Sequence, residues 1–249
     1  RAEELAQLKA LLSAPDCRLL SLIGIGGSGK TRLALALAEQ SGAEFRDGHV
    51  FVPLLLAHDA ETAVREIAAA SGAAAGSSLE LAASIGDSHQ LLILDNCEQV
   101  EGLTGLLETL LSHCPELRIL VTSRRRPELS GGWTYDLTGL TTWRSSDSES
   151  EAFQLFEAAA RRVAAGLSFT AADTEEVRRI TQLVQGLPLA LELAASWLRL
   201  MPVRSIRESL ERDLELLETD QPDLEPRHRS LSAVLERTWN DLEPFAAEA

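Results

Sequence analysis

The chain has 249 residues, of which 45% are hydrophobic and 24% are charged. These values are ordinary for a globular protein, and they exclude wholesale disorder, a collagen-like fibre and a membrane bundle. The net charge of −15 disfavours binding to the phosphate backbone of a nucleic acid, which needs a basic footprint, but it leaves room for a small local anion site.

The cysteines, the apolar runs and the first residue of the chain indicate the cellular compartment of the protein. The three cysteines, Cys17, Cys97 and Cys114, are an odd number without a CxxC pair, so we expect buried thiols in a reducing compartment, not disulfides or zinc ligands. No apolar run reaches the roughly 18 residues of a membrane helix. The chain starts without methionine, and we expect it to be a piece of a longer cytoplasmic protein.

The first 140 residues alternate between short apolar runs and amphipathic stretches. A helix is predicted over residues 1–13, where Leu5, Leu8 and Leu12 recur at helical spacing. Strands are predicted over 17–24, 48–56, 90–96, 116–123 and 133–140. Helices are predicted over 33–40, over 59–86 on both sides of a loop near 71–78, and over 101–112. This alternation predicts a parallel, doubly wound α/β sheet.

After residue 140 the pattern becomes helical. Residues 141–150 form a polar linker whose Ser148 stands three positions before Glu151, the spacing of a capping box, and the helix that follows carries Phe153 and Phe156 on one face. Asp173 and Glu176 repeat that spacing before the next helix.

The remaining helices are separated by glycine and proline. Gly186 is suited to end one helix and Pro188 to begin the next, and a further helix is predicted over 203–217. Residues 218–226 read as an acidic linker, and 230–242 as a last helix.

One motif carries specific chemistry. Residues 24–31, GIGGSGKT, fit G-x-x-x-x-G-K-[ST] between a predicted strand and a predicted helix. Glycines let the backbone amides wrap a phosphate, and the helix N-terminus adds positive potential. Lys30 is expected to bridge the β- and γ-phosphates, and the Thr31 hydroxyl to bind Mg²⁺. The alternative is a glycine-rich turn with an exposed lysine. The expected nucleotide contacts from this segment are Gly26, Gly27, Ser28, Gly29, Lys30, Thr31 and Arg32.

Asp95 ends the apolar run LLIL, so we expect it at the carboxyl edge of the sheet, holding Mg²⁺ with Thr31 as a Walker B acid. The alternative is a carboxylate that caps the following helix. The next residue, Asn96, is neutral where a hydrolytic ATPase usually has an acid to orient the attacking water. Glu98 is a candidate for that task, but we expect it to be a surface residue of the next helix. Cys97 is expected to be a core thiol.

Arg124 follows Thr122 and Ser123 at the end of the next predicted strand. An arginine at this position reaches the carboxyl edge of the sheet, and its planar guanidinium group can donate hydrogen bonds to the γ-phosphate. The alternative is that residues 124–126, all arginine, form a solvated turn, and we assign Arg125 and Arg126 to such a turn. The five histidines have no metal-ligand spacing. Trp143, Trp197 and Trp239 are expected to be packing residues.

These segments together resemble a known family. The series GIGGSGKTRLALALA, LLILDNCEQV, ILVTSRR and GLPLALELAASWL, in this order, resembles the STAND class of signalling NTPases, which includes the NB-ARC and apoptotic-type ATPases and bacterial relatives in multidomain transcription regulators. The opening RAEEL is similar to the end of a family element, with Arg1 and Glu4 at the matching positions.

The resemblance implies an architecture. It implies a P-loop nucleotide-binding domain over 1–145 with an extra strand between the P-loop and Walker B strands, a helical lid domain over 146–225 and the start of a truncated winged-helix domain over 226–249. It also implies that Pro188 lies against the adenine or ribose, and that Arg124 is the sensor arginine.

It further implies an activity. The family works as an ATP/ADP switch, and we expect slow Mg²⁺-dependent hydrolysis with Lys30, Asp95 and Arg124 as catalytic residues. Self-association in the ATP state, and C-terminal sensor repeats and an output domain in the parent protein, are expected. We expect no membrane contact and no direct nucleic-acid contact by this fragment. A turnover ATPase of the AAA type is the alternative function, followed by a P-loop small-molecule kinase.

Overall fold

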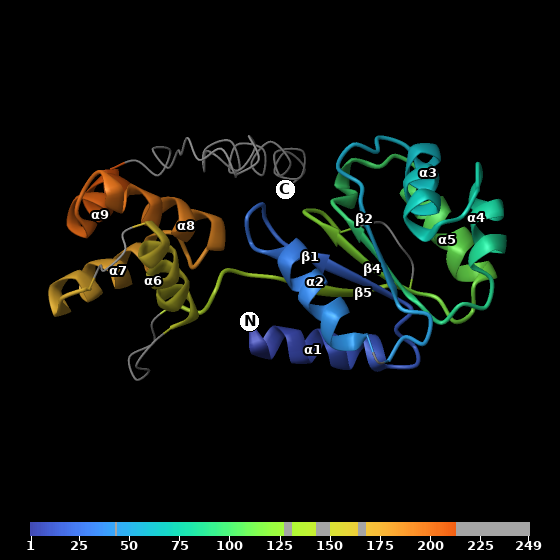
Figure 1. The fold of residues 1–249 in the computed structure, drawn as a ribbon, viewed down its shortest axis with the longest axis horizontal. Helices are drawn as coiled ribbons and strands as arrows, with labels where there is room; N and C mark the ends of the chain where they lie inside the picture. The colour runs from blue at the N-terminus through green and yellow to red at the C-terminus, as the bar shows by residue number, and fades with distance from the viewer. Residues whose placement is uncertain (43, 127–130, 143–149, 164–167, 213–249) are drawn as a thin grey trace, which may run out of the picture. The chain divides into compact units, whose positions relative to one another are not determined.

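We analysed a computed structural model of the chain, which describes residues 1–42, 44–126, 131–142, 150–163 and 168–212 (Figure 1). Contacts between residues divide the chain into two compact units. The first comprises Arg1–Gly24 and Lys30–Leu137, and the second comprises Ile25–Gly29 and the residues from Thr138 onward. The first unit has two buried hydrophobic clusters and the second has one, so each unit is described separately.

The first unit is built around a five-stranded sheet. Its strand order is β2-β3-β4-β1-β5, and every neighbouring pair is parallel. The strands are β1 (Leu19–Ile23), β2 (His49–Pro53), β3 (Leu91–Asp95), β4 (Arg118–Ser123) and β5 (Trp133–Asp136). Strand β4 lies between β1, which leads into residues 24–31, and β3, which ends at Asp95. The doubly wound parallel sheet and its extra strand are therefore confirmed.

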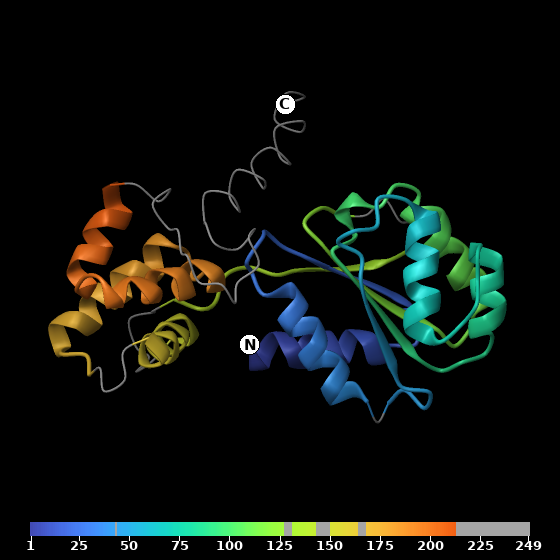
Figure 2. The ribbon, with the colours of Figure 1, turned by 45° about the horizontal axis from the view of Figure 1, so that its top comes forward.

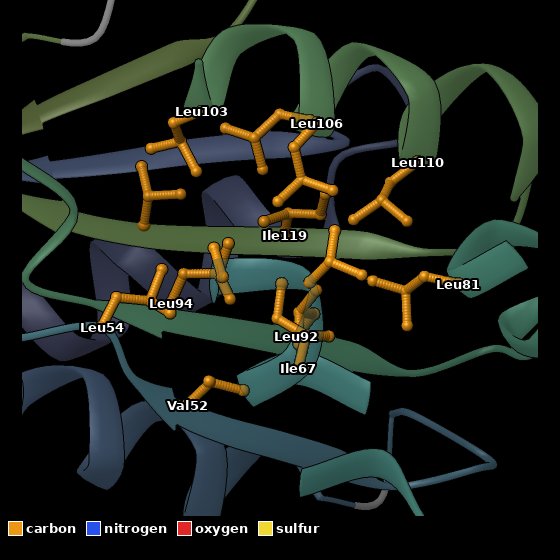
Figure 3. Close-up of a cluster of buried hydrophobic side chains, with 14 of the residues drawn as sticks. Val52, Leu54, Ile67, Leu81, Leu92, Leu94, Leu103, Leu106, Leu110 and Ile119 are labelled. Carbon is orange, nitrogen blue, oxygen red and sulfur yellow. The ribbon is translucent and has the colours of Figure 1, made fainter. Parts of the chain in front are cut away.

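Helices cover both faces of this sheet (Figures 1 and 2). One face packs against α1 (Ala2–Ser13) and α2 (Lys30–Ser41). The other packs against α3 (Ala60–Ser71), α4 (Ser78–Ile85) and α5 (Leu103–His113). Successive strand residues alternate between the two clusters, as strand geometry requires: Leu92 and Leu94 face α3–α5 (Figure 3), whereas Leu91 and Ile93 face α1 and α2. The central strands read as continuous apolar runs because both of their faces are buried.

Two arginines tie helix ends to the sheet. Arg18 donates to the carbonyl oxygens of Leu111 and Cys114 at the end of α5, at 2.8 and 2.5 Å. Arg118 donates to the carbonyl oxygen of Ala14, just after α1, at 2.6 Å. Leu111 lies in the last turn of α5, where carbonyl groups have no partner farther along the helix, and a cation near a helix C-terminus complements the helix dipole.

The described helical part of the second unit consists of α6 (Glu151–Val163), α7 (Ala171–Leu183), α8 (Pro188–Ser196), the 3₁₀ turn η2 (Trp197–Arg199) and α9 (Val203–Arg212). The helices bury one cluster around Phe156, Ile180 and Leu191, and Trp197 packs against its border. Gly186 has φ 67° and follows α7, and Pro188 is the first residue of α8, as predicted.

The structure corrects both predicted capping boxes in this unit. Ser148 lies outside the described residues, and the hydroxyl that caps α6 is that of Ser150, which accepts from the Phe153 N–H at 3.2 Å. The capping box of α7 joins Thr170 and Asp173, so Asp173 closes the box instead of opening it. The spacing rule located both helix starts within three residues but selected the wrong partners.

Some predictions lie outside the described residues. These are most of the 141–150 linker with Trp143, the end of the 203–217 helix, and the linker, last helix and Trp239 beyond residue 212. Among the described residues, no helix is long and apolar enough to cross a membrane. The three cysteines are buried free thiols, as expected.

Candidate functional site

The segment 24–31 follows strand β1 at the carboxyl edge of the sheet. The Gly24 N–H donates to the Ser123 carbonyl oxygen at 3.2 Å, which continues the pairing of β1 with β4 by one residue. Lys30 is the first residue of α2, and its Nζ donates to the Gly24 carbonyl oxygen at 2.7 Å. Only 8% of Lys30 is exposed, so its ammonium group is withdrawn from solvent and is not a solvated side chain.

Asp95 ends strand β3, two strands away from β1 at the same edge of the sheet, and lies beside two hydroxyl groups. Its carboxylate accepts from the Thr31 hydroxyl at 2.8 Å and from the Thr122 hydroxyl at 2.6 Å. The Thr122 oxygen in turn accepts from the Asn96 N–H at 3.0 Å. The structure thus brings together Thr31 and Asp95, which sequence analysis assigned to one site. It adds Thr122, whose position opposite Asp95 depends on the strand order.

The backbone turns sharply after Asp95. Asn96 has φ 70° and ψ 48°, in the left-handed region that asparagine tolerates better than most residues. This turn leads into the 3₁₀ helix η1 (Cys97–Gln99). Asparagine at this position thus meets a backbone requirement that is independent of acid chemistry. Cys97 is a core thiol, as predicted, and its Sγ lies 3.3 Å from the Leu94 carbonyl oxygen.

Glu98 departs from its predicted role as a surface residue. Its side chain is 9% exposed and its Oε1 lies 3.2 Å from the Nε of Arg124, whose side chain is 14% exposed. The turn at Asn96 directs the η1 segment back toward the end of β4, so Glu98 returns to the sheet edge. Arg126 fits the predicted solvated turn, because it is exposed and pairs with Asp136 at 2.6 Å.

The charges at this edge act on one another. Burial lowers the pKa of Lys30 to about 8, and the Arg124 guanidinium contributes to the lowering, while the Glu98 and Asp95 carboxylates oppose it. Two cations and two carboxylates therefore share the edge, so an incoming phosphate meets a locally balanced site despite the net charge of −15 on the chain.

Residues Ile25–Gly29 belong to the second unit by their contacts. The Leu189 N–H, near the start of α8, donates to the Gly27 carbonyl oxygen at 3.3 Å. Gly27 has φ +76°, and a Cβ added there would lie 2.6 Å from the Leu189 Cβ, so only glycine fits. Pro188 neighbours this contact, and its Cγ lies 4.0 Å from the position of a Cβ on Gly29. Its predicted contact with a nucleotide base or sugar stays a prediction.

The donor set suits Mg²⁺ rather than a softer metal. Thr31 is exposed and supplies a hydroxyl oxygen, and Asp95 supplies a carboxylate oxygen, which are the hard ligands that Mg²⁺ takes together with water and phosphate. No group of three or more His, Cys, Asp or Glu side chains suited to a metal occurs among the described residues.

Sequence comparisons place the chain beside bacterial regulators. No protein-family model matches the chain. It is 36% identical over 217 residues to a Mycobacterium tuberculosis protein named "Putative HTH-type transcriptional regulator Rv0890c", covering 84% of this chain and 23% of that protein. It is 31% identical over 245 residues to "Regulatory protein AfsR" of Streptomyces griseus, covering 92% of this chain and 23% of that protein. The chain thus spans about a quarter of the length of these relatives.

Solved structures identify the fold. Cdc6p from Pyrobaculum aerophilum matches with a TM-score of 0.56 at 17% identity, over 80% of this chain and 62% of that one. The Aeropyrum pernix ORC2 protein, solved as ADPNP–ADP complexes, matches with a TM-score of 0.51 at 18% identity, over 85% and 66%. The chain has the fold of the P-loop ATPases, and within its sheet unit the buried Lys30 follows strand β1 and Asp95 ends strand β3.

Proposed function

We propose that the chain is the ATP/ADP-binding switch module of a multidomain STAND-type regulator, with slow Mg²⁺-dependent ATP hydrolysis. The observation that carries the proposal is the joint placement of Lys30, Thr31 and Asp95 at the carboxyl edge of the sheet. Lys30 would hold the phosphates, and Thr31 and Asp95 would hold a Mg²⁺ ion. When bound, the metal would neutralise part of the phosphate charge. The similarity to regulators much longer than this chain supports a module within a larger protein.

The protein offers a matched control for a binding test, because Lys30 and Lys9 are its two lysines. Lys9 lies on α1, where its Nζ pairs with Glu44 at 2.9 Å. We expect Lys30→Ala to lose ATP and ADP binding by about 100-fold or more, since a charge-assisted contact to phosphate is removed. Lys9→Ala should bind as the wild type does. Calorimetric titration with each nucleotide, with and without Mg²⁺, measures the effect. Wild-type affinity in Lys30→Ala would refute the phosphate-binding assignment.

A nucleotide switch and a turnover ATPase differ in the rate of hydrolysis and in the nucleotide that the purified protein retains. The purified chain is denatured and its nucleotide identified by chromatography, and hydrolysis is followed over many turnovers. Retained ADP with turnover of minutes or slower is the result expected of a switch. An empty site with turnover on the order of 1 s⁻¹ or faster would favour a turnover ATPase. A turnover ATPase stays the alternative function because Glu98 brings a buried carboxylate to the edge of the candidate site.

The switch also includes an assembly step. We propose that the ATP state self-associates and the ADP state does not, as the resemblance implies. Light scattering coupled to size-exclusion chromatography, run with a non-hydrolysable ATP analogue and with ADP at equal protein concentration, measures the mass directly. Equal masses in both states would remove self-association by this part of the chain from the proposal.

A further inference from the structure

Glu98 and Arg124 form a buried ion pair that the P-loop chemistry leaves unexplained. They come from two neighbouring segments at the same sheet edge, with Glu98 on η1 after β3 and Arg124 directly after β4. Both side chains are largely withdrawn from solvent, at 9% and 14% exposure. Removing two charges from water is costly, so such a pair is weak evidence of a purely stabilising role.

The pair is also incompletely bonded. It joins the Arg124 Nε to the Glu98 Oε1 at 3.2 Å. Within the described part of the chain, the Arg124 Nη1 and the Glu98 Oε2 are buried and have no hydrogen-bond partner. A buried donor left without an acceptor costs free energy, and native structures keep few of them. The Nη1 group is therefore a donor that a ligand oxygen would satisfy.

The pair lies within electrostatic reach of the phosphate-binding lysine. Of the nearby charges that act on Lys30, the Glu98 carboxylate is the strongest, followed by the Arg124 guanidinium and the Asp95 carboxylate. Geometry gives the same placement, because Arg124 stands two residues after Thr122, whose hydroxyl bonds Asp95 beside Thr31. An arginine engaged through Nε alone keeps its other N–H groups for a second acceptor.

We propose that Glu98 is a positioning residue, which holds Arg124 through Nε so that the Nη1 side of the guanidinium is presented to the γ-phosphate. The inference rests on the proposed function and assigns a residue to the discrimination of ATP from ADP. Holding the guanidinium in place before binding spares the ligand the entropy cost of ordering a long side chain. ADP lacks the γ-phosphate, so its affinity does not depend on Glu98.

Three variants at position 98 separate positioning from simple charge. Glu98→Ala removes the acceptor for Nε, and we expect ATP to bind about tenfold more weakly while ADP stays within about twofold. Glu98→Gln keeps an oxygen that accepts from Nε, so it should recover most of the ATP affinity. If the carboxylate acts only as a charge near phosphate, both variants lose the same repulsion and both bind ATP more tightly. Glu98→Met fills the same space without an acceptor, and it replaces Glu98→Ala if that variant does not fold.

A double-mutant cycle tests whether the effect passes through Arg124. In an Arg124→Ala background, Glu98→Ala should cause no further loss of ATP affinity. The matched control is Asp136→Asn, which breaks the exposed pair with Arg126 and should leave both nucleotides unaffected. Affinities are measured by calorimetry with Mg²⁺, and thermal unfolding of each variant is recorded beside them.

Each outcome decides the proposal. A selective ATP loss in Glu98→Ala that Gln restores and that vanishes in the Arg124→Ala background supports positioning. Tighter ATP binding in Glu98→Ala would overturn the proposal, because it would mean that ATP has to break the Glu98–Arg124 ion pair in order to bind. Equal losses for ATP and ADP would overturn it in favour of a structural role. If the wild type binds neither nucleotide, the proposed function itself fails, which is a result distinct from binding that ignores Glu98.

Discussion

At the scale of single residues, the burial of Lys30 makes nucleotide binding depend on pH. Its pKa in the free site is about 8, because burial disfavours the ammonium form, and phosphate raises this pKa by favouring that form. Below pH 8 the lysine is protonated before and after binding, so pH has little effect. Above pH 8 binding must take up a proton, and affinity falls as pH rises, by at most about tenfold per pH unit.

The uptake of that proton can be measured directly. Titrating ADP into the protein at about pH 9, in buffers with different ionisation enthalpies, should give up to one proton taken up per ADP bound. The Lys9→Ala variant should behave as the wild type does. A pH-independent affinity between pH 7 and 9.5 would mean that Lys30 is already charged in the free site.

At the scale of elements, the start of α7 rests on a complete capping box. The Thr170 hydroxyl accepts from the Asp173 N–H at 3.2 Å, and the Asp173 carboxylate accepts from the Thr170 N–H at 3.0 Å. We expect Thr170→Ala to lower the free energy of unfolding by about 1 kcal/mol. Urea unfolding measures this change. Thr174→Ala is the matched control, because its hydroxyl bonds only back to the Thr170 carbonyl oxygen at 3.0 Å, and it should change stability by less than half as much.

The capping box also lowers the pKa of Asp173, through its hydrogen bonds from Thr170. A carboxylate whose pKa is lowered in the folded state contributes stability that is present above its unfolded pKa and is lost as pH falls through its folded pKa. The loss caused by Thr170→Ala should therefore be larger at pH 7 than at pH 3. An equal loss of stability at pH 7 and at pH 3 would mean that the effect comes from the Thr170 hydroxyl alone and not from the charge of Asp173.

Elements with one strong local signal were predictable from the sequence. The buried strands were predictable, because a continuous apolar run such as 91–94 fits a strand that is covered on both faces of a doubly wound sheet. The site was predictable where the motif itself carries the geometry, as at Lys30 and Thr31. Glu98 was missed because its burial depends on the left-handed turn at Asn96, a backbone feature without an apolar periodicity. Thr122 was missed as a partner of Asp95 because strand order is a non-local property.

At the scale of the whole molecule, the chain has separate hydrophobic clusters in its two units. Phe156 is fully buried in the helical cluster, and Leu92 lies in a cluster of the sheet unit. We expect Phe156→Ala to destabilise the helical unit by about 3–5 kcal/mol. Hydrogen exchange should then accelerate in α6 and α8, while the strands β1, β3 and β4 keep their protection.

Leu92→Ala is the reciprocal variant and should give the opposite pattern. Exchange should accelerate in β3 and its neighbours and stay unchanged in α6 and α8. If either substitution accelerates exchange in both units equally, the chain unfolds as one cooperative block, and the two clusters do not correspond to separate folding units.

The scarcity of lysine has a practical consequence for following occupancy of the site. A lysine-specific protease, applied after denaturation, can cut this chain only after positions 9 and 30. A lysine amine with a pKa near 8 is partly uncharged in mildly alkaline buffer, and the uncharged form reacts with an acylating reagent, whereas the same amine bound to a phosphate stays charged and unreactive. Acylation at position 30 abolishes that cut. The fragment pattern on a gel would then report how much of the protein held nucleotide when the reagent was added.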